Sequence, residues 1–282
     1  MAYSINPVMQ LCAVSTMPQQ GSPGTLKHLS IVNIATHIDS LWAADYIQNY
    51  LDQYNFMYII GPFDVLPSHL IQELIELLVQ KRQLSRRHLH LMIHQHLESL
   101  HLGKCSSCMT DAIIKLVQIR CKKLKRLDIS RCNRLTSYAM SMALSYLPKL
   151  VYLNLYTTNC TDDVLGTIGA ICVHLRDLNI CKTHVTDKGI VSLCGGDSLV
   201  PFSEGLVSLL ETVGHGLETL TLYGYDDIDV LAIGSSMFEL LEGKNCLQRL
   251  VLLNCKEVMR RDYDQMMKIV ANQHFQLEIT WT

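Results

Sequence analysis

The sequence lacks an excess of either charge and any long run of apolar residues. Its 24 Lys and Arg residues against 26 Asp and Glu residues leave a net charge of -2, which gives no support to a dedicated nucleic-acid-binding protein. No apolar stretch reaches the roughly 18 residues needed to span a bilayer, so we expect no membrane segment. Hydrophobic residues nevertheless make up 49% of the chain, which excludes a disordered protein and allows a sizeable core.

The cysteine content does not fit a secreted disulfide scaffold either. The 11 cysteines are an odd number and are spread over a long chain, whereas such scaffolds are short and evenly paired. Residues 1–24 contain no Lys or Arg, and Pro7 interrupts their apolar stretch, so they make a poor signal peptide and are expected to form a flexible tail. We therefore expect a reducing compartment, namely the cytoplasm, the nucleus or both.

One sequence frame, Leu-x-x-Leu-x-(Leu/Ile), recurs through the second two thirds of the chain. The first leucines of its six copies are Leu97, Leu124, Leu150, Leu175, Leu217 and Leu247. Leucines at alternating positions point to the same side of a short strand, and an apolar-periodic helix can return the chain to the next strand. Because no single repeat can bury its apolar face alone, the frame predicts an α/β solenoid over residues 95–282, with parallel strands inside and helices outside.

The solenoid is expected to contain six or seven strands, with the central leucine of each frame in one buried column. These leucines are Leu100, Leu127, Leu153, Leu178, Leu220 and Leu250. The longest step between frames, from Leu175 to Leu217, holds an insertion near residues 195–214, which either projects as a loop or lengthens one helical side.

Cysteines and Thr-Asp pairs recur at fixed places within the repeats. The cysteines lie three positions before or after the frames, at Cys121, Cys132, Cys172 and Cys255, and the pairs that open the helices are Thr110-Asp111, Thr161-Asp162 and Thr186-Asp187. Thr or Asp can cap a helix N-terminus. This arrangement resembles the cysteine-containing leucine-rich repeat, which is common in substrate receptors of cullin-type ubiquitin ligases. The resemblance implies that the cysteines are buried, reduced and free of metal.

Residues 25–94 precede the repeats and are expected to form a helical cap. The apolar residues spaced to share one face of its first helix are Leu26, Leu29, Ile34 and Ile38. The segment from Thr25 to Ile34 resembles the elongin-binding box, in which Leu26, Ser30 and Ile34 take the leucine, small and aliphatic positions. The resemblance implies that this helix enters an apolar groove of elongin C, with Leu26 as the buried anchor.

A second short pattern follows the first. Residues 66–74 resemble the cullin box that comes after the elongin box in such receptors. The matching positions are Leu66, Pro67, Leu70 and Leu74. The resemblance implies a contact with a cullin, whereas the alternative is that both helices only cover the apolar end of the first repeat.

The whole layout also resembles the antagonist of mitotic exit network proteins. A short helical start, a Leu-Pro helix and a compact repeat array carry this likeness, together with residues 185–190 and 277–282. The family implies a protein-interaction role, and in fungi it restrains a small GTPase of mitotic exit. The zyg-eleven and zer-one ubiquitin ligase receptors share the two boxes but carry a long armadillo portion that is not present in this sequence.

Signals for metal binding or catalysis are weak. Cys105 and Cys108 have the spacing of metal ligands but lack a second pair, and the four histidines between residues 88 and 96 lack a carboxylate or cysteine to complete a set. No phosphate-binding loop, nucleophile elbow or dinucleotide fingerprint occurs. We therefore expect a non-enzymatic protein with no cofactor and no metal.

The outward-facing residues of the strands are expected to line the concave face of the solenoid, where Tyr and Arg are favoured contacts. The candidate target-binding residues are Arg126, Asp128, Ser130, Tyr152, Asn154, Tyr156, Asp177, Asn179, Thr221 and Tyr223. The alternative is an ordinary polar sheet surface that binds nothing.

Together these patterns predict an adaptor that selects an unidentified protein for ubiquitination and degradation. Its expected partners are elongin B and C and a cullin, with no nucleic acid and no membrane. One alternative is a scaffold or inhibitor of a signalling or cell-cycle protein that recruits no ligase. The other is an F-box receptor that begins at Leu66 and binds the Skp adaptor of an SCF ligase, although only 31 residues separate Leu66 from Leu97.

Overall fold

The structure is a computed structural model, which describes residues 25–44, 61–186, 189, 192–193, 218–223, 249–253, 260–261, 263–264, 267–268 and 278–281. The expected tail at residues 1–24, the insertion near residues 195–214 and Cys255 lie outside the described residues. Within the described part of the chain, no helix has both the length and the apolar character that crossing a bilayer requires.

Seven parallel strands form one sheet, and their order across the sheet is their order along the chain. They are β1 (Ser99–His101), β2 (Arg126–Asp128), β3 (Tyr152–Asn154), β4 (Asp177–Asn179), β5 (Thr219–Tyr223), β6 (Arg249–Leu253) and β7 (Glu278–Trp281). The central residues of the frames pair in register, from Leu100 through Leu127, Leu153, Leu178 and Leu220 to Leu250. The predicted strand number and register are confirmed.

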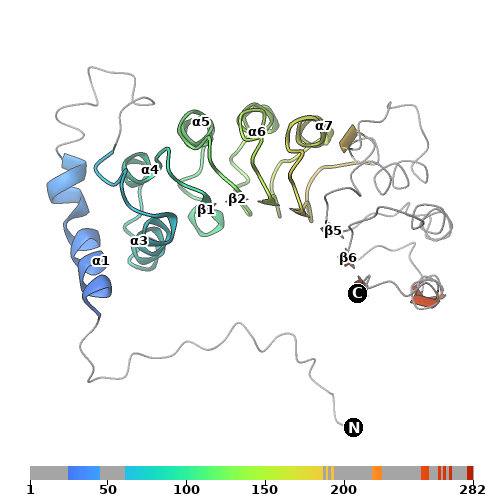
Figure 1. Cartoon of the computed structure of the whole chain (residues 1–282), viewed down its shortest axis with the longest axis horizontal. Coiled ribbons are helices and arrows are strands. Elements are labelled where there is room, and N and C mark those ends of the chain that lie inside the picture. The colour runs from blue at the N-terminus through green and yellow to red at the C-terminus, as the bar shows by residue number, and fades with distance from the viewer. Residues whose placement is uncertain are drawn as a thin grey trace, which may run out of the picture.

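Helices cover the outer side of the sheet and its N-terminal end (Figure 1). The outer layer consists of α5 (Asp111–Arg120), α6 (Ser137–Leu144) and α7 (Asp162–Ile171), which pack side by side. The N-terminal end consists of α1 (Leu26–His37), the π-helical turn η2 (Ile38–Ala43), α3 (Ser68–Gln80) and α4 (Arg86–Met92), and the short 3-10 turn η4 (Gly103–Cys105) follows β1. The chain is therefore an α/β leucine-rich-repeat solenoid with a helical cap, as the frame predicted.

The core is built from the repeat leucines and from cysteines. The central leucines of the first four strands, Leu100, Leu127, Leu153 and Leu178, are at most 2% exposed. Cys132 and Cys172 are buried, as expected. The Cys132 Sγ donates to the carbonyl oxygen of Leu102 at 3.8 Å, and the Cys172 Sγ donates to that of Leu147 at 3.9 Å. Each thiol thus links its repeat to the preceding one while filling the space of a small apolar side chain.

The Thr-Asp pairs do not all cap their own helices, which corrects the expectation from the sequence. Thr110 and Thr161 occupy the N-cap positions of α5 and α7, but their side chains make no capping hydrogen bond. Thr136 does cap α6, because its Oγ1 accepts from the Ala139 N–H at 3.2 Å. The aspartates that begin α5 and α7 bond to the neighbouring repeat instead.

Candidate protein-interaction surfaces

The helix α1 lies at the outer edge of the cap and has two different faces. Its start is capped by Thr25, whose Oγ1 accepts from the His28 N–H at 3.3 Å. Ile31, Ala35 and Ile38 are spaced by four and three residues, so they share one face, and all three are buried in the core. This face packs on α3 and makes α1 part of the cap.

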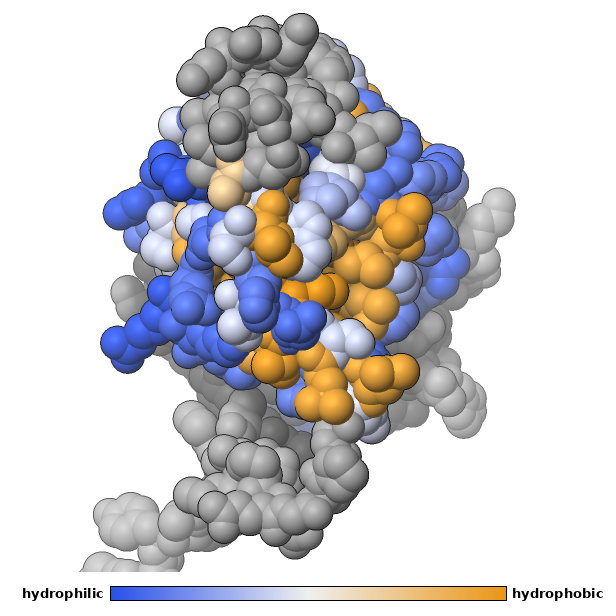
Figure 2. Space-filling model, turned by 90° about the vertical axis from the view of Figure 1, so that its left-hand side faces the viewer, coloured by the Kyte–Doolittle hydropathy of each residue, from blue (hydrophilic) through white to orange (hydrophobic). Residues whose placement is uncertain are grey.

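The opposite side of α1 is exposed and carries two leucines among polar side chains such as Asn33 and His37. Leu26 is 82% exposed, Leu29 is 53% exposed and Leu41, in the π-helical turn, is 58% exposed. The Ser30 hydroxyl donates to the Leu26 carbonyl oxygen at 2.8 Å, so it is satisfied within the helix and leaves only a small side chain on the surface. Figure 2 views this end of the molecule and shows hydrophobic residues gathered in the middle of the face, with hydrophilic residues on either side.

The expected apolar face of α1 is therefore wrong in part. Leu26 and Leu29 lie on the solvent side, whereas Ile38 is buried and Ile34 is partly buried against the core. The physical reason is that α1 sits at the edge of the cap and packs mainly on one helix, so only a narrow stripe of it is covered. Of the three elongin-box positions, Leu26 and Ser30 are exposed and Ile34 is partly covered.

The helix α3 packs against α1. An ion pair joins Lys27 in the first turn of α1 to Glu73, and the Lys81 Nζ donates to the Thr36 Oγ1 at 3.3 Å near the ends of both helices. Pro67 lies at the N-cap position of α3 and is exposed. The two predicted boxes therefore belong to helices that contact each other in the cap.

The four cullin-box positions differ in exposure. Pro67 is exposed, Leu66 and Leu70 are partly buried against the core, and Leu74 is 1% exposed. The expectation that Leu74 contacts a partner does not agree with this burial. Its side chain belongs to the apolar stripe of α3 that faces the first repeat, so it supports the helix from behind.

Polar side chains end the strands of the concave face and form a ladder. Asp128, Asn154 and Asn179 pair in register, and the Oδ1 of each accepts the backbone N–H two residues further on, at 2.9 to 3.0 Å. The Asn154 Nδ2 also donates to the Asp128 Oδ2 at 3.2 Å. These bonds close the turn after each strand and hold the side chains in place.

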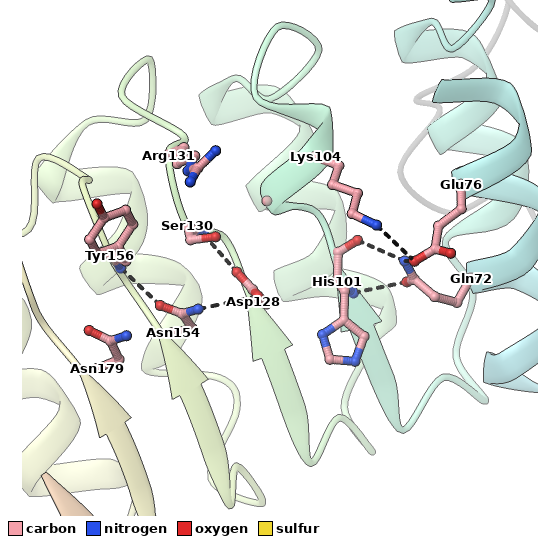
Figure 3. A pocket seen from close by; sticks show the side chains of 11 residues that line it. Gln72, Glu76, His101, Lys104, Asp128, Ser130, Arg131, Asn154, Tyr156 and Asn179 are labelled. Atoms are coloured by element: carbon pink, nitrogen blue, oxygen red, sulfur yellow. Dashed lines mark hydrogen bonds and ion pairs between the residues drawn. The ribbon is translucent and has the colours of Figure 1, made fainter. Parts of the chain in front are cut away.

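A hollow of about 490 Å³ lies on the N-terminal half of the concave face (Figure 3). Its lining residues are Gln72, Glu76, His101, Gly103, Lys104, Asp128, Ser130, Arg131, Asn154, Tyr156 and Asn179. The end wall comes from α3, because the Gln72 amide donates to the His101 carbonyl oxygen at 3.2 Å and accepts the His101 N–H at 3.1 Å. Gln72 thus covers the edge of β1, and Lys104 lies 3.7 Å from the Glu76 carboxylate beside it.

Two cations flank Tyr156 at the rim of this hollow. The Arg131 Cζ lies 5.9 Å from the centre of the Tyr156 ring and the Lys182 Nζ lies 5.7 Å from it. The neighbouring Thr157 and Lys182 side chains, together with the charges of Lys182 and Arg131, lower the pKa of the Tyr156 phenol. Arg131, Thr157 and Lys182 each follow a strand by three residues and adopt φ of 61°, 55° and 54°, so the same left-handed turn recurs in three repeats.

The other predicted concave-face residues lie closer to the starts of the strands or further along the sheet. Arg126 lies over the Tyr152 ring, 4.4 Å from its centre, and burial together with the Asp128 charge raises the pKa of Tyr152. Asp177 pairs with Tyr152 in register, and Thr221 continues the register on β5. The side chain of Tyr223 lies outside the described residues.

Several residues of the hollow and its rim were not identified from the sequence, among them Arg131, Lys182, Gln72 and Glu76. Arg131 and Lys182 carried a signal, because each follows the last hydrophobic residue of its frame by two positions. Gln72 and Glu76 carried none, since their role depends on the packing of α3 against the edge of the sheet.

The predicted histidine cluster is part of the cap. His88 is buried; its Nδ1 accepts from the Ser85 N–H at 3.3 Å, and its Nε2 donates to the Asp39 Oδ1 at 2.8 Å, which ties α4 to η2. Burial lowers the pKa of His90 and of His94. Among the residues that the structure describes, no group of three or more His, Cys, Asp or Glu side chains could hold a metal ion.

No family model matches this sequence, and no curated protein does. Among solved structures, a chain in the crystal structure of a complex of Rad7 and Elc1 from yeast is similar, with 19% sequence identity and a TM-score of 0.47. The alignment covers 86% of this chain and 70% of the yeast chain. The class of this protein, a capped leucine-rich-repeat solenoid, rests on its own strand register and core.

Proposed function

We propose that this protein is a non-enzymatic adaptor of a cullin-RING ubiquitin ligase, which binds elongin B and C through α1, a cullin through the start of α3, and a target through the concave face. The observation that carries the proposal is that one face of α1 is buried in the cap while the other face presents an exposed leucine. Ile31, Ala35 and Ile38 fix the helix to the cap, and Leu26 is left 82% exposed on the other side. Leu29 and Leu41 are also more than half exposed at this end of the molecule, and a group of exposed apolar side chains is what a partner-binding surface presents.

The energetics of such a contact are those of an amphipathic helix in an apolar groove. Burying one leucine side chain contributes about 1.5–3 kcal/mol, which corresponds to roughly 10- to 150-fold in affinity. Ser30 follows Leu26 by four residues and is also exposed, so its small side chain permits close approach of a second helix. Ile34 is already partly covered by the cap and adds less area.

The start of α3 supports the second half of the proposal. Pro67 is exposed at the N-cap position of α3, and α3 packs against α1. A partner on α1 and a second one at Leu66 and Pro67 would therefore both bind the cap at the N-terminal end of the solenoid. Ubiquitin transfer itself would belong to the partners, and the cytoplasm or the nucleus is the expected location.

A pull-down of purified elongin B and C by the full chain tests this proposal. Wild-type protein should retain elongin at micromolar concentrations, and Leu26→Ala should weaken the binding by roughly 10- to 150-fold. Val173→Ala is the matched control, because Val173 is 69% exposed but lies after α7, away from the cap. Pro67→Ala should reduce capture of the cullin and leave elongin bound.

The same experiment separates the alternatives. If wild type retains neither elongin nor the Skp adaptor, the scaffold or inhibitor function takes the place of the ligase adaptor. Capture of the Skp adaptor in place of elongin would identify an F-box receptor. The described residues between Leu66 and β1 contain two helices, α3 and α4, which leaves little room for that module.

A further inference from the structure

Exposed basic side chains follow the edge of the sheet at which its strands begin. Backbone hydrogen bonds join three repeats along this edge, because the Val151 N–H donates to the Lys125 carbonyl oxygen at 2.7 Å and the Arg176 N–H donates to that of Val151 at 2.8 Å. Lys123 and Lys149 each precede the first leucine of a frame by one residue, so they hold equivalent places in neighbouring repeats, and both are exposed. Such places are between about 5 Å, the spacing of strands, and about 10 Å, the spacing of packed helices, apart.

Lys123 and Lys149 form no ion pair within the part of the chain that the structure describes. The Glu98 carboxylate is already paired with Lys125 at 2.9 Å, and this contact, with a smaller effect of the Lys123 charge, lowers the pKa of Glu98. The two lysines are not explained by helix capping either. Lys123 follows the last residue of α5 by three positions and Lys149 follows that of α6 by five, beyond the last turn in which a cation compensates the helix dipole.

Tyrosine rings lie among these cations. The Lys122 Nζ is 4.2 Å from the centre of the Tyr146 ring, which connects the end of α5 to the end of α6, and Tyr146 is nevertheless 48% exposed. Arg126 lies over the partly buried Tyr152 ring in a similar way, at 4.4 Å. Tyrosine and arginine are enriched at protein–protein interfaces. The basic edge therefore consists of Lys122, Lys123, Arg126, Tyr146 and Lys149.

We propose that the basic edge binds an acidic segment of a partner protein, whose carboxylates meet Lys123 and Lys149 and whose apolar side chains lie on Tyr146. The basic edge lies where the strands begin, whereas the hollow of the concave face is lined by residues that end the strands, such as Asp128 and Asn154. The inference adds a binding surface to the proposed function and does not depend on the elongin contact of α1.

A protein segment fits the basic edge better than a nucleic acid does. Carboxylates interrupt the row of cations, because Glu98 and Glu218 pair with Lys125 and Arg176 at the same edge. These carboxylates would repel a continuous run of phosphates, whereas a protein segment can place its own acids opposite the lysines and neutral residues opposite Glu98 and Glu218. The net charge of -2 for the whole chain also disfavours a nucleic acid.

The test measures fluorescence polarisation of two labelled degenerate peptide libraries with the full chain. Alternate positions are fixed as glutamate in one library and as glutamine in the other. Wild type should bind the glutamate library about tenfold more tightly at low salt, as several exposed ion pairs together allow. This difference should vanish near 1 M salt, where the Debye length is about 3 Å. Lys123→Glu and Lys149→Glu should each weaken binding of the glutamate library about three- to tenfold, and Tyr146→Ala should weaken binding of both libraries.

Lys115→Glu is the matched control, because Lys115 is exposed in the middle of α5 and the variant changes the net charge by the same amount. It should leave the preference for glutamate intact. Equal binding of the two libraries, or an equal loss in Lys115→Glu, would overturn the proposal. So would stronger competition by a DNA duplex, or by vesicles of phosphatidylserine and phosphatidylcholine, than by unlabelled glutamate library. Elongin retention is measured on the same preparations, so a chain that keeps elongin but shows no preference for glutamate contradicts this inference alone.

Discussion

The Asp111 carboxylate binds Thr136, which lies one repeat further along the solenoid, through both of its oxygens. Its Oδ1 accepts the Thr136 backbone N–H at 2.9 Å and its Oδ2 accepts the Thr136 hydroxyl at 2.8 Å. Asp162 binds Thr186 in the same way, at 2.7 and 2.6 Å. The recurring Thr-Asp pair is therefore a link between repeats, and at Thr136 this link fixes the start of α6.

Loss of this link should lower the stability of the solenoid. Asp111→Ala removes two hydrogen bonds to a charged acceptor at an exposed site, so we expect a loss of about 1–2 kcal/mol in the free energy of unfolding. Urea denaturation of Asp111→Ala, Thr136→Val and the double variant gives the coupling between the two residues. Strictly additive losses would show that the two side chains do not stabilise each other. Lys115→Ala, on the same helix, serves as the surface control.

The fold was largely predictable because the same sequence frame occurs six times in the chain. Each copy of Leu-x-x-Leu-x-(Leu/Ile) places its central leucine at the same depth, as Leu127 and Leu153 show, so six copies fix strand number, direction and register together. The Thr-Asp pairs were recognised but assigned to the wrong partner. Their bonds run between helices that are about 25 residues apart in the sequence, and capping rules consider only the nearest turn.

The candidate surfaces were less predictable. Spacing alone placed Leu26 and Ile38 on one face of α1, but the neighbours of a helix decide which of its apolar sides is buried, and α3 covers the side of Ile31 and Ile38. Leu74 matched a motif position and is buried for the same reason. The frame did predict that Tyr156 faces outward, but not the two cations beside it.

Two leucine-sized side chains on opposite faces of α1 should behave oppositely when truncated. Ile31 is 7% exposed, so Ile31→Ala should cost about 2–4 kcal/mol in stability of the cap. Leu26→Ala removes an exposed side chain and should change stability by no more than about 0.5 kcal/mol. Melting curves of both variants, measured beside elongin binding, check this. A large loss of stability in Leu26→Ala would show that this leucine packs on the cap after all.

The buried cysteines should resist alkylation in the native protein. Burial raises the pKa of Cys121, Cys132 and Cys172 to about 12, and the thiolate is the reactive form. At pH 8 only about one molecule in ten thousand would carry the thiolate at such a site, as the four-unit gap between pH and pKa requires. Among the seven cysteines that the structure describes, iodoacetamide labelling followed by peptide mapping should modify the partly exposed Cys108 first. Labelling of the protein unfolded in guanidinium gives the full reactivity of each cysteine for comparison. If Cys121 in the native protein reacted as fast as it does in guanidinium, its burial would be contradicted.

The cap should lose stability as the pH falls below about 6.5, through its buried histidines. Burial is the main cause that lowers the pKa of His94 below 6.5; the Asp64 charge raises this pKa and the His96 charge lowers it further. Burial, followed by the Arg120 charge, lowers the pKa of His90. In the unfolded chain these histidines take up protons near pH 6.5, whereas in the folded chain they do so only at lower pH, so the unfolded state binds more protons in this window and stability declines on acidification.

One such histidine can contribute up to about 1.4 kcal/mol for each pH unit between its unfolded and folded pKa. The comparison of melting temperatures at pH 7.5 and 5.5 should therefore show a smaller decrease in His94→Asn than in wild type. Asn suits this site, because its amide oxygen can take the place of the His94 Nδ1, which accepts the His96 N–H at 3.2 Å. His28→Asn, at an exposed position of α1, is the matched control and should follow wild type. If His94→Asn loses as much stability on acidification as wild type does, the acid sensitivity lies elsewhere in the chain.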